Sequence, residues 1–344
     1  MTMKKIISIS LVLMLLLGIL AVPAVAEDRT CGTLSYLNMT EEEDTNLSSV
    51  RRPMMRILFL YGVVDVDKVA EGGKTNYLFF DTMNDLLLAL QAGKVDGIKV
   101  PYYTAKYLCS TNDELKLNRE YHFENATGVA EWALSLLSDG YSFMLKEDNT
   151  ALKDAFDAQL TAMKEDGTLQ KLVDEHIIKV SEGGEPVAVA FEKFEGDPIK
   201  VGVTGDLPPM DYVAPDGTFA GFNTAVLAEI GKRLQKNIEL VQVENVGRAL
   251  ALSEGVVDVV FWTRSMSEKM VESLAAKRGL SKEEQEAKRA GLQEVLTDEE
   301  KALLGAAGKP TDEEFVKIKD RDLPPSTIIT QPYFSDFPVW VLMK

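Results

Sequence analysis

Apolar and polar residues along residues 199–264 are arranged in a pattern that predicts strands and helices in turn. Residues 199–204 alternate with the period of a strand, and 223–234 carry apolar side chains on one helical face. A strand, a short helix and a buried strand are expected in that order within 238–262. Pro208-Pro209 interrupts the backbone at the mouth of the first strand, where α/β proteins bind their ligands. The pattern therefore predicts an α/β unit with a candidate ligand site at its strand ends.

A second stretch repeats part of this unit earlier in the chain. Ala89–Asp96 and Ala251–Asp258 share the same order, in which a helix ends at Gly, Asp follows, and a buried strand begins. The glycine is expected to end the helix in a left-handed conformation. Asp96 and Asp258 are expected to turn and cap the chain rather than to act as catalysts. A repeat at this long distance predicts one unit used twice, not a short solenoid repeat.

The remaining pattern predicts the elements that join these units. Residues 141–145 form an expected strand, and 150–178 form an expected helix with a break at Asp166-Gly167. Residues 181–197 predict a linker that contains one strand, at 187–191. Residues 56–61 fit a buried strand and part of a helix equally, because the periodicity of so short an apolar run does not separate the two.

The first 26 residues have the features of a secretory signal peptide. Lys4 and Lys5 precede an apolar run from Ile6 to Leu20, and Ala24-Val25-Ala26 fits the A-x-A cleavage rule. The alternative is a retained membrane anchor, since the run is nearly long enough for a short span. Cleavage leaves about 318 residues, enough for two compact lobes. We expect a protein that is secreted across the inner membrane and is periplasmic or extracellular.

Charge and composition exclude several classes of partner. The net charge of −17 becomes −19 once Lys4 and Lys5 are removed, which argues against nucleic acid and anionic lipid as partners. Cys31 and Cys109 fit a disulfide and two free thiols equally well. The two histidines, His122 and His176, have no motif around them and are expected to be surface or packing residues. The sequence predicts no metal, nucleotide, haem or other cofactor.

Several short motifs resemble a known family. Within 199–258 these are Val201-Gly202-Val203, Pro208-Pro209-Met210, Asp216-Gly217, Gly221-Phe222-Asn223 and Gly255-Val256-Val257-Asp258. Together they resemble the first lobe of periplasmic solute-binding proteins of the polar amino-acid type (family 3), which serve ABC importers. Gln331–Phe334 is similar to that family's strand leading to the hinge. The resemblance implies an α/β fold of the bilobed type II periplasmic-binding-protein kind, with two mixed-sheet lobes around a cleft.

The order of the segments differs from that family. Residues 76–108 resemble its second lobe and 140–178 its closing segment, so second-lobe-like sequence precedes first-lobe-like sequence. Two architectures fit this order. One is a circular permutant joined through 181–197. The other consists of two incomplete modules that complete each other, either within one chain or between the two chains of a dimer. The expected divisions are a signal peptide (1–26), a second-lobe-like segment (27–140), a helical return (141–180), a linker (181–197), a first-lobe-like segment (198–265 and 323–344) and a charged helical insertion (266–322).

The resemblance implies a function and a set of ligand contacts. A small polar solute, an amino acid or related carboxylate, would bind between the lobes, and the closed form would be recognised by an ABC transporter permease at the membrane. The protein would not be an enzyme. The implied contacts are Met210, Tyr212, Asn245, Trp262, Thr263, Arg264, Tyr102 and Tyr103. Arg264 is expected to pair with a ligand carboxylate.

Departures from the family keep two alternatives open. Pro101 stands where amino-acid binders place an Asp, Asn245 replaces an expected aromatic residue, and the Thr-x-Thr-x-x-Arg stretch survives only loosely in 263–269. One alternative is a degenerate or sensory module that acts through a protein partner. The other is a dehydratase-like enzyme on the same scaffold, for which Glu244 is the candidate acid or base.

Overall fold

The computed structural model describes residues 28–35, 54–65, 75–214, 217–244, 247–267, 269, 271 and 323–344. The predicted signal peptide, Asn245 and most of the expected insertion at 266–322 lie outside the described residues. No helix among the described residues is long and apolar enough to span a membrane.

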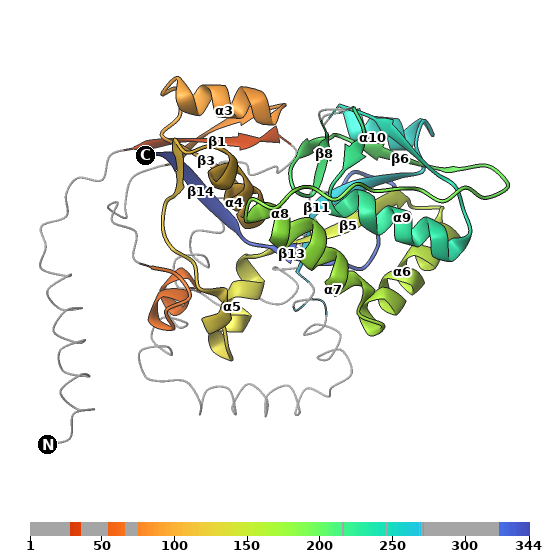
Figure 1. The fold of residues 1–344 in the computed structure, drawn as a ribbon, viewed down its shortest axis with the longest axis horizontal. Helices are drawn as coiled ribbons and strands as arrows, with labels where there is room; N and C mark the ends of the chain where they lie inside the picture. Colours follow the sequence, from red (N-terminus) through yellow and green to blue (C-terminus); the bar gives the residue numbers. More distant parts are fainter. Residues whose placement is uncertain are drawn as a thin grey trace, which may run out of the picture.

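Two separate sheets form the framework of the molecule (Figure 1). The first, which we call lobe A with its helices, has the order β2-β1-β3-β14-β4. The pairs β1–β2 and β1–β3 are parallel, and β14 is antiparallel to both of its neighbours. The strand bounds are β1 (Arg29–Leu34), β2 (Thr75–Phe80), β3 (Gly97–Pro101), β4 (Leu115–Leu117) and β14 (Pro338–Met343). The helices of this lobe are 54–60, α3 (Met83–Gln91), α4 (Tyr102–Thr111) and η2 (Phe123–Asn125). Helix α5 (Val129–Leu137) precedes β5, and the carbonyl oxygen of its Ser135 accepts from the Ser267 hydroxyl.

The second sheet, lobe B, has the order β10-β6-β11-β5-β12, with β13 also paired to β5. Its strands are β5 (Asp139–Lys146), β6 (Ile199–Val203), β10 (Ile238–Gln242), β11 (Val259–Met266), β12 (Thr327–Ile329) and β13 (Phe334–Asp336). A small sheet of β7 (Asp206–Leu207), β8 (Asp211–Val213) and β9 (Phe219–Ala220) stands at the end of β6. The helices are α6 (Thr150–Glu165), α7 (Thr168–Val173), a π-helical turn (Asp174–Ile178), α8 (Lys179–Ser181), α9 (Phe222–Leu234) and α10 (Arg248–Ser253).

The internal repeat corresponds to the same local structure in both lobes. Asp96 accepts a hydrogen bond from the Thr30 amide at 2.7 Å, and Asp258 accepts one from the Lys200 amide at 2.9 Å. Each carboxylate thereby holds the start of the neighbouring strand. Gly93 and Gly255 precede them with φ of 66° and 73°, a left-handed conformation that glycine adopts without strain. Both aspartates therefore have the structural role that the sequence predicted.

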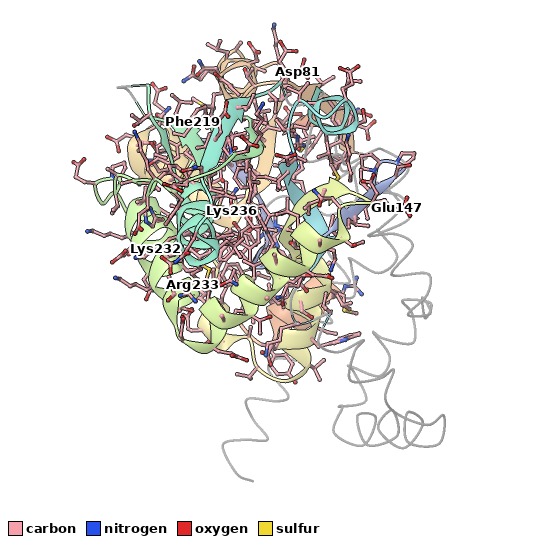
Figure 2. The ribbon with its side chains drawn as sticks, turned by 90° about the vertical axis from the view of Figure 1, so that its right-hand side faces the viewer. Asp81, Glu147, Phe219, Lys232, Arg233 and Lys236 are labelled. Atoms are coloured by element: carbon pink, nitrogen blue, oxygen red, sulfur yellow. The ribbon has the colours of Figure 1, made fainter. Side chains whose placement is uncertain are left out.

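Two strand segments cross between the lobes. The chain enters lobe B through β5, which pairs with β11, and returns through β13 to β14, which pairs with β3 (Figure 1). Helices α6 and α7 then pack on α9 of the same lobe. Arg233 holds this packing, because it donates to Asp166 at 2.8 Å and to Thr168 at 2.9 Å (Figure 2).

The structure settles three expectations left by the pattern. Residues 54–60 are helical, so the helical reading of the apolar run at 56–61 is confirmed for the most part. The strand expected at 187–191 is wrong, because 184–194 form neither helix nor strand. Cys31 and Cys109 are both free thiols, so no disulfide joins them.

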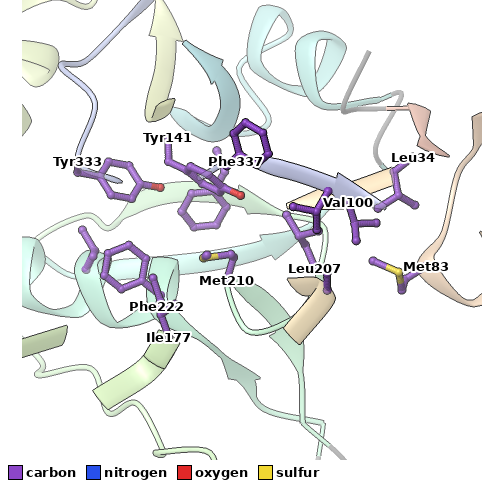
Figure 3. Packing of buried hydrophobic residues seen from close by; sticks show 14 of the residues in the cluster. Leu34, Met83, Val100, Tyr141, Ile177, Leu207, Met210, Phe222, Tyr333 and Phe337 are labelled. Atoms are coloured by element: carbon purple, nitrogen blue, oxygen red, sulfur yellow. The ribbon is translucent and has the colours of Figure 1, made fainter. Parts of the chain in front are cut away.

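One buried apolar cluster continues through both lobes (Figure 3). Leu34, Met83 and Val100 of lobe A belong to the same cluster as Leu207 and Met210 of lobe B. The core of each lobe is thus continuous with apolar side chains that lie between the lobes.

Candidate functional site

The candidate site lies where the strand ends of the two lobes face each other. In lobe B the chain leaves β6 and forms the β7–β8 hairpin, with Met210 at the turn. Met210 is fully buried, and Figure 3 shows its side chain in the row of apolar residues that runs from Phe222 to Met83. This predicted ligand contact is therefore packed against the protein's own side chains in the described conformation.

The turn at Met210 depends on Gly221. Gly221 has φ of 107°, and a β-carbon there would stand 2.6 Å from the Met210 carbonyl oxygen. The amides of Phe222 and Asn223 donate to the carbonyl oxygens of Pro209 and Met210. The start of α9 and the hairpin turn are therefore held together by close backbone contact that leaves no room for a side chain.

Asp211 is a buried carboxyl at the base of the hairpin. Its Oδ2 accepts from the Thr204 amide at 3.1 Å, the Thr204 hydroxyl at 3.3 Å and the Gly205 amide at 3.3 Å. Its Oδ1 is buried and has no hydrogen-bond partner among the described residues. Burial raises the pKa of Asp211 to about 6, against the lowering effect of these hydrogen bonds. Asp211 therefore holds the hairpin and is a titratable group next to the candidate site.

The predicted tyrosines occupy two different places. Tyr212, on β8, is buried, and its ring centroid lies 6.5 Å from that of Tyr107 on α4, across the interlobe boundary. Burial, with the neighbouring Tyr107, raises the pKa of Tyr212 to about 12. Tyr102 and Tyr103 begin α4, and the Tyr102 ring packs against Tyr121 and Phe123. The lobe A partner of Tyr212 is thus Tyr107, which the sequence analysis did not single out.

A second buried carboxyl, Asp336, is on the segment β13–β14 that crosses between the lobes. It accepts from the Tyr103 amide at 3.2 Å and from the Phe337 amide at 2.7 Å, at the start of α4. Burial raises the pKa of Asp336 to about 7, and the charge of Asp139, its partner in the β5–β13 register, adds to this. Asp336 therefore places a carboxyl beside the residues that follow Pro101. Pro101 is the position at which the resemblance led us to expect an aspartate.

A hydrogen bond joins the lobes at the N-terminus of α3. Asp206 of the β7–β8 hairpin accepts from the Met83 amide at 3.3 Å, although the two residues are 123 positions apart. Thr82 caps the same helix end through the Asp85 amide. The first-turn amides of a helix favour a carboxylate, because they lack partners within the helix. Asp206 therefore occupies a position at which an anionic group is stabilised, and it holds the hairpin against lobe A.

This contact gives a direct prediction. Asp206→Ala is expected to accelerate hydrogen exchange of the Met83 amide by about tenfold, the loss expected for one charge-assisted hydrogen bond. Hydrogen exchange followed by mass spectrometry on peptides covering 81–86 measures this. Asp197→Asn, an exposed carboxyl of the same lobe, is the matched control for charge. Unchanged exchange at Met83, with peptides of β5 still protected, would contradict the contact.

The other predicted contacts lie at or beyond the edge of the described residues. Trp262, Thr263 and Arg264 belong to β11, at an irregularity in its pairing with β5 between Trp262 and Ser265. Their side chains and the whole of Asn245 lie outside what the structure describes. A cavity of about 780 Å³ lies elsewhere in lobe B, between Lys146 at the far end of β5, Leu250 and Pro324, and its lining contains none of the predicted contacts.

Sequence reasoning missed the carboxyls Asp206, Asp211 and Asp336, of which Asp211 and Asp336 are buried. Each lies in a stretch rich in Gly, Pro or aromatic residues, which is the signal of a turn and not of a site. Asp206 and Asp336 accept from amides 123 and 233 positions away, and the burial of Asp211 and Asp336 depends on packing that the local sequence does not show. For example, Asp336 is 233 positions from Tyr103, whose amide it accepts. Sequence spacing offers no means of finding such a pair.

Residues 199–289 match the family described as bacterial extracellular solute-binding proteins, family 3. No curated protein matches the chain.

Similar solved structures cover most of the chain at low identity. One is the ligand-binding component of an ABC-type import system from Staphylococcus aureus, with 11% identity, a TM-score of 0.35, and coverage of 92% of this chain and 66% of that one. A putative L-cystine ABC transporter from Listeria monocytogenes has 11% identity, a TM-score of 0.32, and coverage of 92% and 83%. A probable amino-acid ABC transporter extracellular-binding protein from Bacillus subtilis has 8% identity, a TM-score of 0.35, and coverage of 92% and 84%.

The present chain thus spans just under two thirds of the Staphylococcus aureus protein. The observed mixed α/β architecture with two sheets agrees with the predicted fold class. The resemblance to the bacterial extracellular solute-binding proteins of family 3 is confirmed for residues 199–289, which include the strands β6, β10 and β11 of lobe B.

Proposed function

We propose that this protein is a secreted solute-binding protein that captures a small polar solute between its lobes for an ABC importer. The observation that carries the proposal is the pair of sheets with equivalent strand order, joined by crossing strands at β5 and at β13–β14. Crossing strands of this kind let two lobes open and close about a hinge, and hinge closure buries a ligand between them. The family match over 199–289 supports the same function.

The proposed ligand is an amino acid or a related carboxylate. Arg264, in β11, is the proposed partner of the ligand carboxylate, since an arginine fork matches a carboxylate in two hydrogen bonds. A membrane permease is the proposed partner of the closed form, and the proposed location is periplasmic or extracellular. No step in this function requires a catalyst.

The chain order is proposed to be a circular permutation in a single chain. Segment 139–146 pairs with β11 inside the same chain, and α6 and α7 pack on α9. The linker 182–198 then joins the end of this helical return to β6. These contacts support the permuted monomer over two modules that complete each other across a dimer.

A thermal-shift screen tests the function. Amino acids and small carboxylates at millimolar concentration are expected to raise the Tm, because a ligand that binds only the folded state stabilises it, by about 2.7 kcal/mol at 100 times its Kd. Arg264→Gln is expected to abolish the stabilisation by carboxylates. Arg56→Gln, an exposed arginine of helix 54–60, is the matched control and is expected to retain it.

One observation favours a second candidate function. Leu207 and Met210, on the side of lobe B that faces lobe A, are both buried in an apolar cluster that includes lobe A residues. A module that acts through a protein partner, without a solute, would keep such a closed interface. The absence of any thermal shift across a broad library would overturn the solute-binding proposal and support this one. Turnover of a stabilising solute would instead support the dehydratase-like alternative, in which Glu244, an exposed residue, is the candidate acid or base.

A further inference from the structure

A short antiparallel bridge in lobe A brings together two segments that are distant in sequence. Val64 pairs with Tyr121 as an isolated bridge. The Asp65 amide donates to the Glu120 carbonyl oxygen at 3.1 Å, and the His122 amide donates to the Val63 carbonyl oxygen at 2.8 Å. Successive side chains of an extended segment point to opposite faces. Asp65, Glu120 and His122 are therefore expected on the face opposite Val64 and Tyr121.

Three metal-binding side chains meet on this face. One ligand atom from each of Asp65, Glu120 and His122 lies within 4.8 Å of the other two. His122 Nε2 is 3.8 Å from Glu120 Oε2. Zinc takes nitrogen and oxygen ligands at about 2.0–2.2 Å, so bound ligand atoms stand about 3.3 Å apart in a tetrahedron. Because Asp65 and Glu120 are exposed, rotation of their side chains can close the remaining distance.

Glu124 adds a second feature found at metal sites. Its Oε1 lies 3.6 Å from His122 Nδ1, on the side of the ring opposite to Nε2. A histidine that binds a metal through one nitrogen commonly donates its other N–H to a carboxylate, which fixes the ring and makes the ligand nitrogen more basic. At 3.6 Å Glu124 is close to this position without a hydrogen bond to His122, and a small side-chain rotation would complete a carboxylate–histidine–metal arrangement.

The backbone under the cluster is firmly held. Val63 and Val64 are buried, and the ring of Tyr121 packs against Tyr102 and Phe337. The donors therefore project from a packed platform, which lowers the entropic cost of bringing them together. That platform is continuous with the start of α4 and the hinge residue Phe337.

We propose that Asp65, Glu120 and His122 form a site for a divalent transition metal, with Glu124 as a positioning residue. The imidazole favours zinc over magnesium or calcium, which prefer ligand sets made only of oxygen. Three protein ligands leave a fourth position for water. The metal would join segment 63–65 to segment 120–122 and would stabilise lobe A beside the hinge.

Isothermal titration calorimetry with zinc chloride tests the proposal in a Cys109→Ser background, which removes the one partly exposed thiol. The expected result is one saturable site on chelator-treated protein, with no comparable binding of magnesium or calcium. His122→Ala is expected to abolish zinc binding. Glu124→Gln is expected to weaken the zinc affinity by about tenfold, the lower end of the effect of such positioning carboxylates.

His176→Gln is the matched control, because His176 is the only other histidine in the chain and lies in the π-helical turn. It should leave zinc affinity unchanged. Zinc should also protect His122 from modification by diethylpyrocarbonate, a readout that does not depend on folding stability. Zinc binding within twofold of the parent in His122→Ala, an equal loss in His176→Gln, or no saturable binding to the parent would each overturn the site.

Discussion

Gly221→Ala is expected to reduce the free energy of unfolding by about 3 kcal/mol or more, among the largest effects of a single substitution in this chain. The backbone of Gly221 has φ of 107° and ψ of 175°, a region that is essentially restricted to glycine. The new β-carbon would also meet the carbonyl oxygens of Met210 and Pro209 at 2.6 and 2.8 Å. Both groups belong to the backbone, so the clash with the new β-carbon can be relieved only if the hairpin turn or the start of α9 moves. Urea denaturation measures the loss.

Gly217→Ala is the matched control for this prediction. Gly217 also has a positive φ, 85°, but a β-carbon there has no neighbour within 4 Å among the residues that the structure describes. Its cost is therefore conformational strain alone, about 1–2 kcal/mol. Similar losses for the two variants would show that the close contact with Met210 does not contribute. The comparison separates strain from packing at the turn that faces lobe A.

The second large effect concerns the hinge carboxyl Asp336. Its pKa is raised from an ordinary 3.8 to about 7 in the folded protein, so the folded state binds the proton more tightly than the unfolded state. Its contribution to stability is therefore complete below the unfolded pKa and is lost as the pH rises toward 7. Three pKa units correspond to a loss on the order of 4 kcal/mol.

Asp336→Asn removes this titration. Relative to the parent protein, the variant is expected to gain on the order of 4 kcal/mol of stability between pH 4 and pH 8. Guanidinium denaturation at a series of pH values measures the difference between the two. The stability of Asp197→Asn, a substitution at an exposed carboxyl, should depend on pH in the same way as that of the parent. A constant difference between Asp336→Asn and the parent would rule out a raised pKa at Asp336. Asp211 titrates in an overlapping range, with a pKa of about 6, and remains present in both proteins.

The two carboxyls bear on how the lobes move. Asp336 is on the strand that crosses between the lobes, and Asp211 supports the hairpin that carries Asp206 to α3. Protonation changes at either group therefore alter the energy of elements that join the lobes.

Much of the local structure could be predicted from the sequence because it depends on near neighbours. The alternation at 199–203 and the apolar face at 222–234 are properties of one strand and one helix. The break at Gly167, with φ of 79°, follows from the inability of other residues to adopt that conformation without strain. The repeated Gly and Asp at 93–96 and 255–258 perform the same turn in both lobes for the same local reason.

The candidate site was predictable only in part. The sequence predicted candidate contacts at the strand ends after β6 and β3, since strand ends in α/β folds mark binding sites. Whether a residue such as Met210 faces a solute or the protein's own core depends on how closely the two lobes approach. That approach is set by contacts between segments more than 100 residues apart, such as Asp206 with the Met83 amide.

The sequence by itself therefore determined most of the elements, the repeated unit and the family resemblance, because each depends on residue types at short spacing. Only the tertiary structure decided that 54–60 is a helix, that Asp211 and Asp336 are buried, and that Asp65, Glu120 and His122 lie on one face. Burial and proximity result from long-range packing, whose free energy is shared among many weak contacts and is not encoded in any one segment.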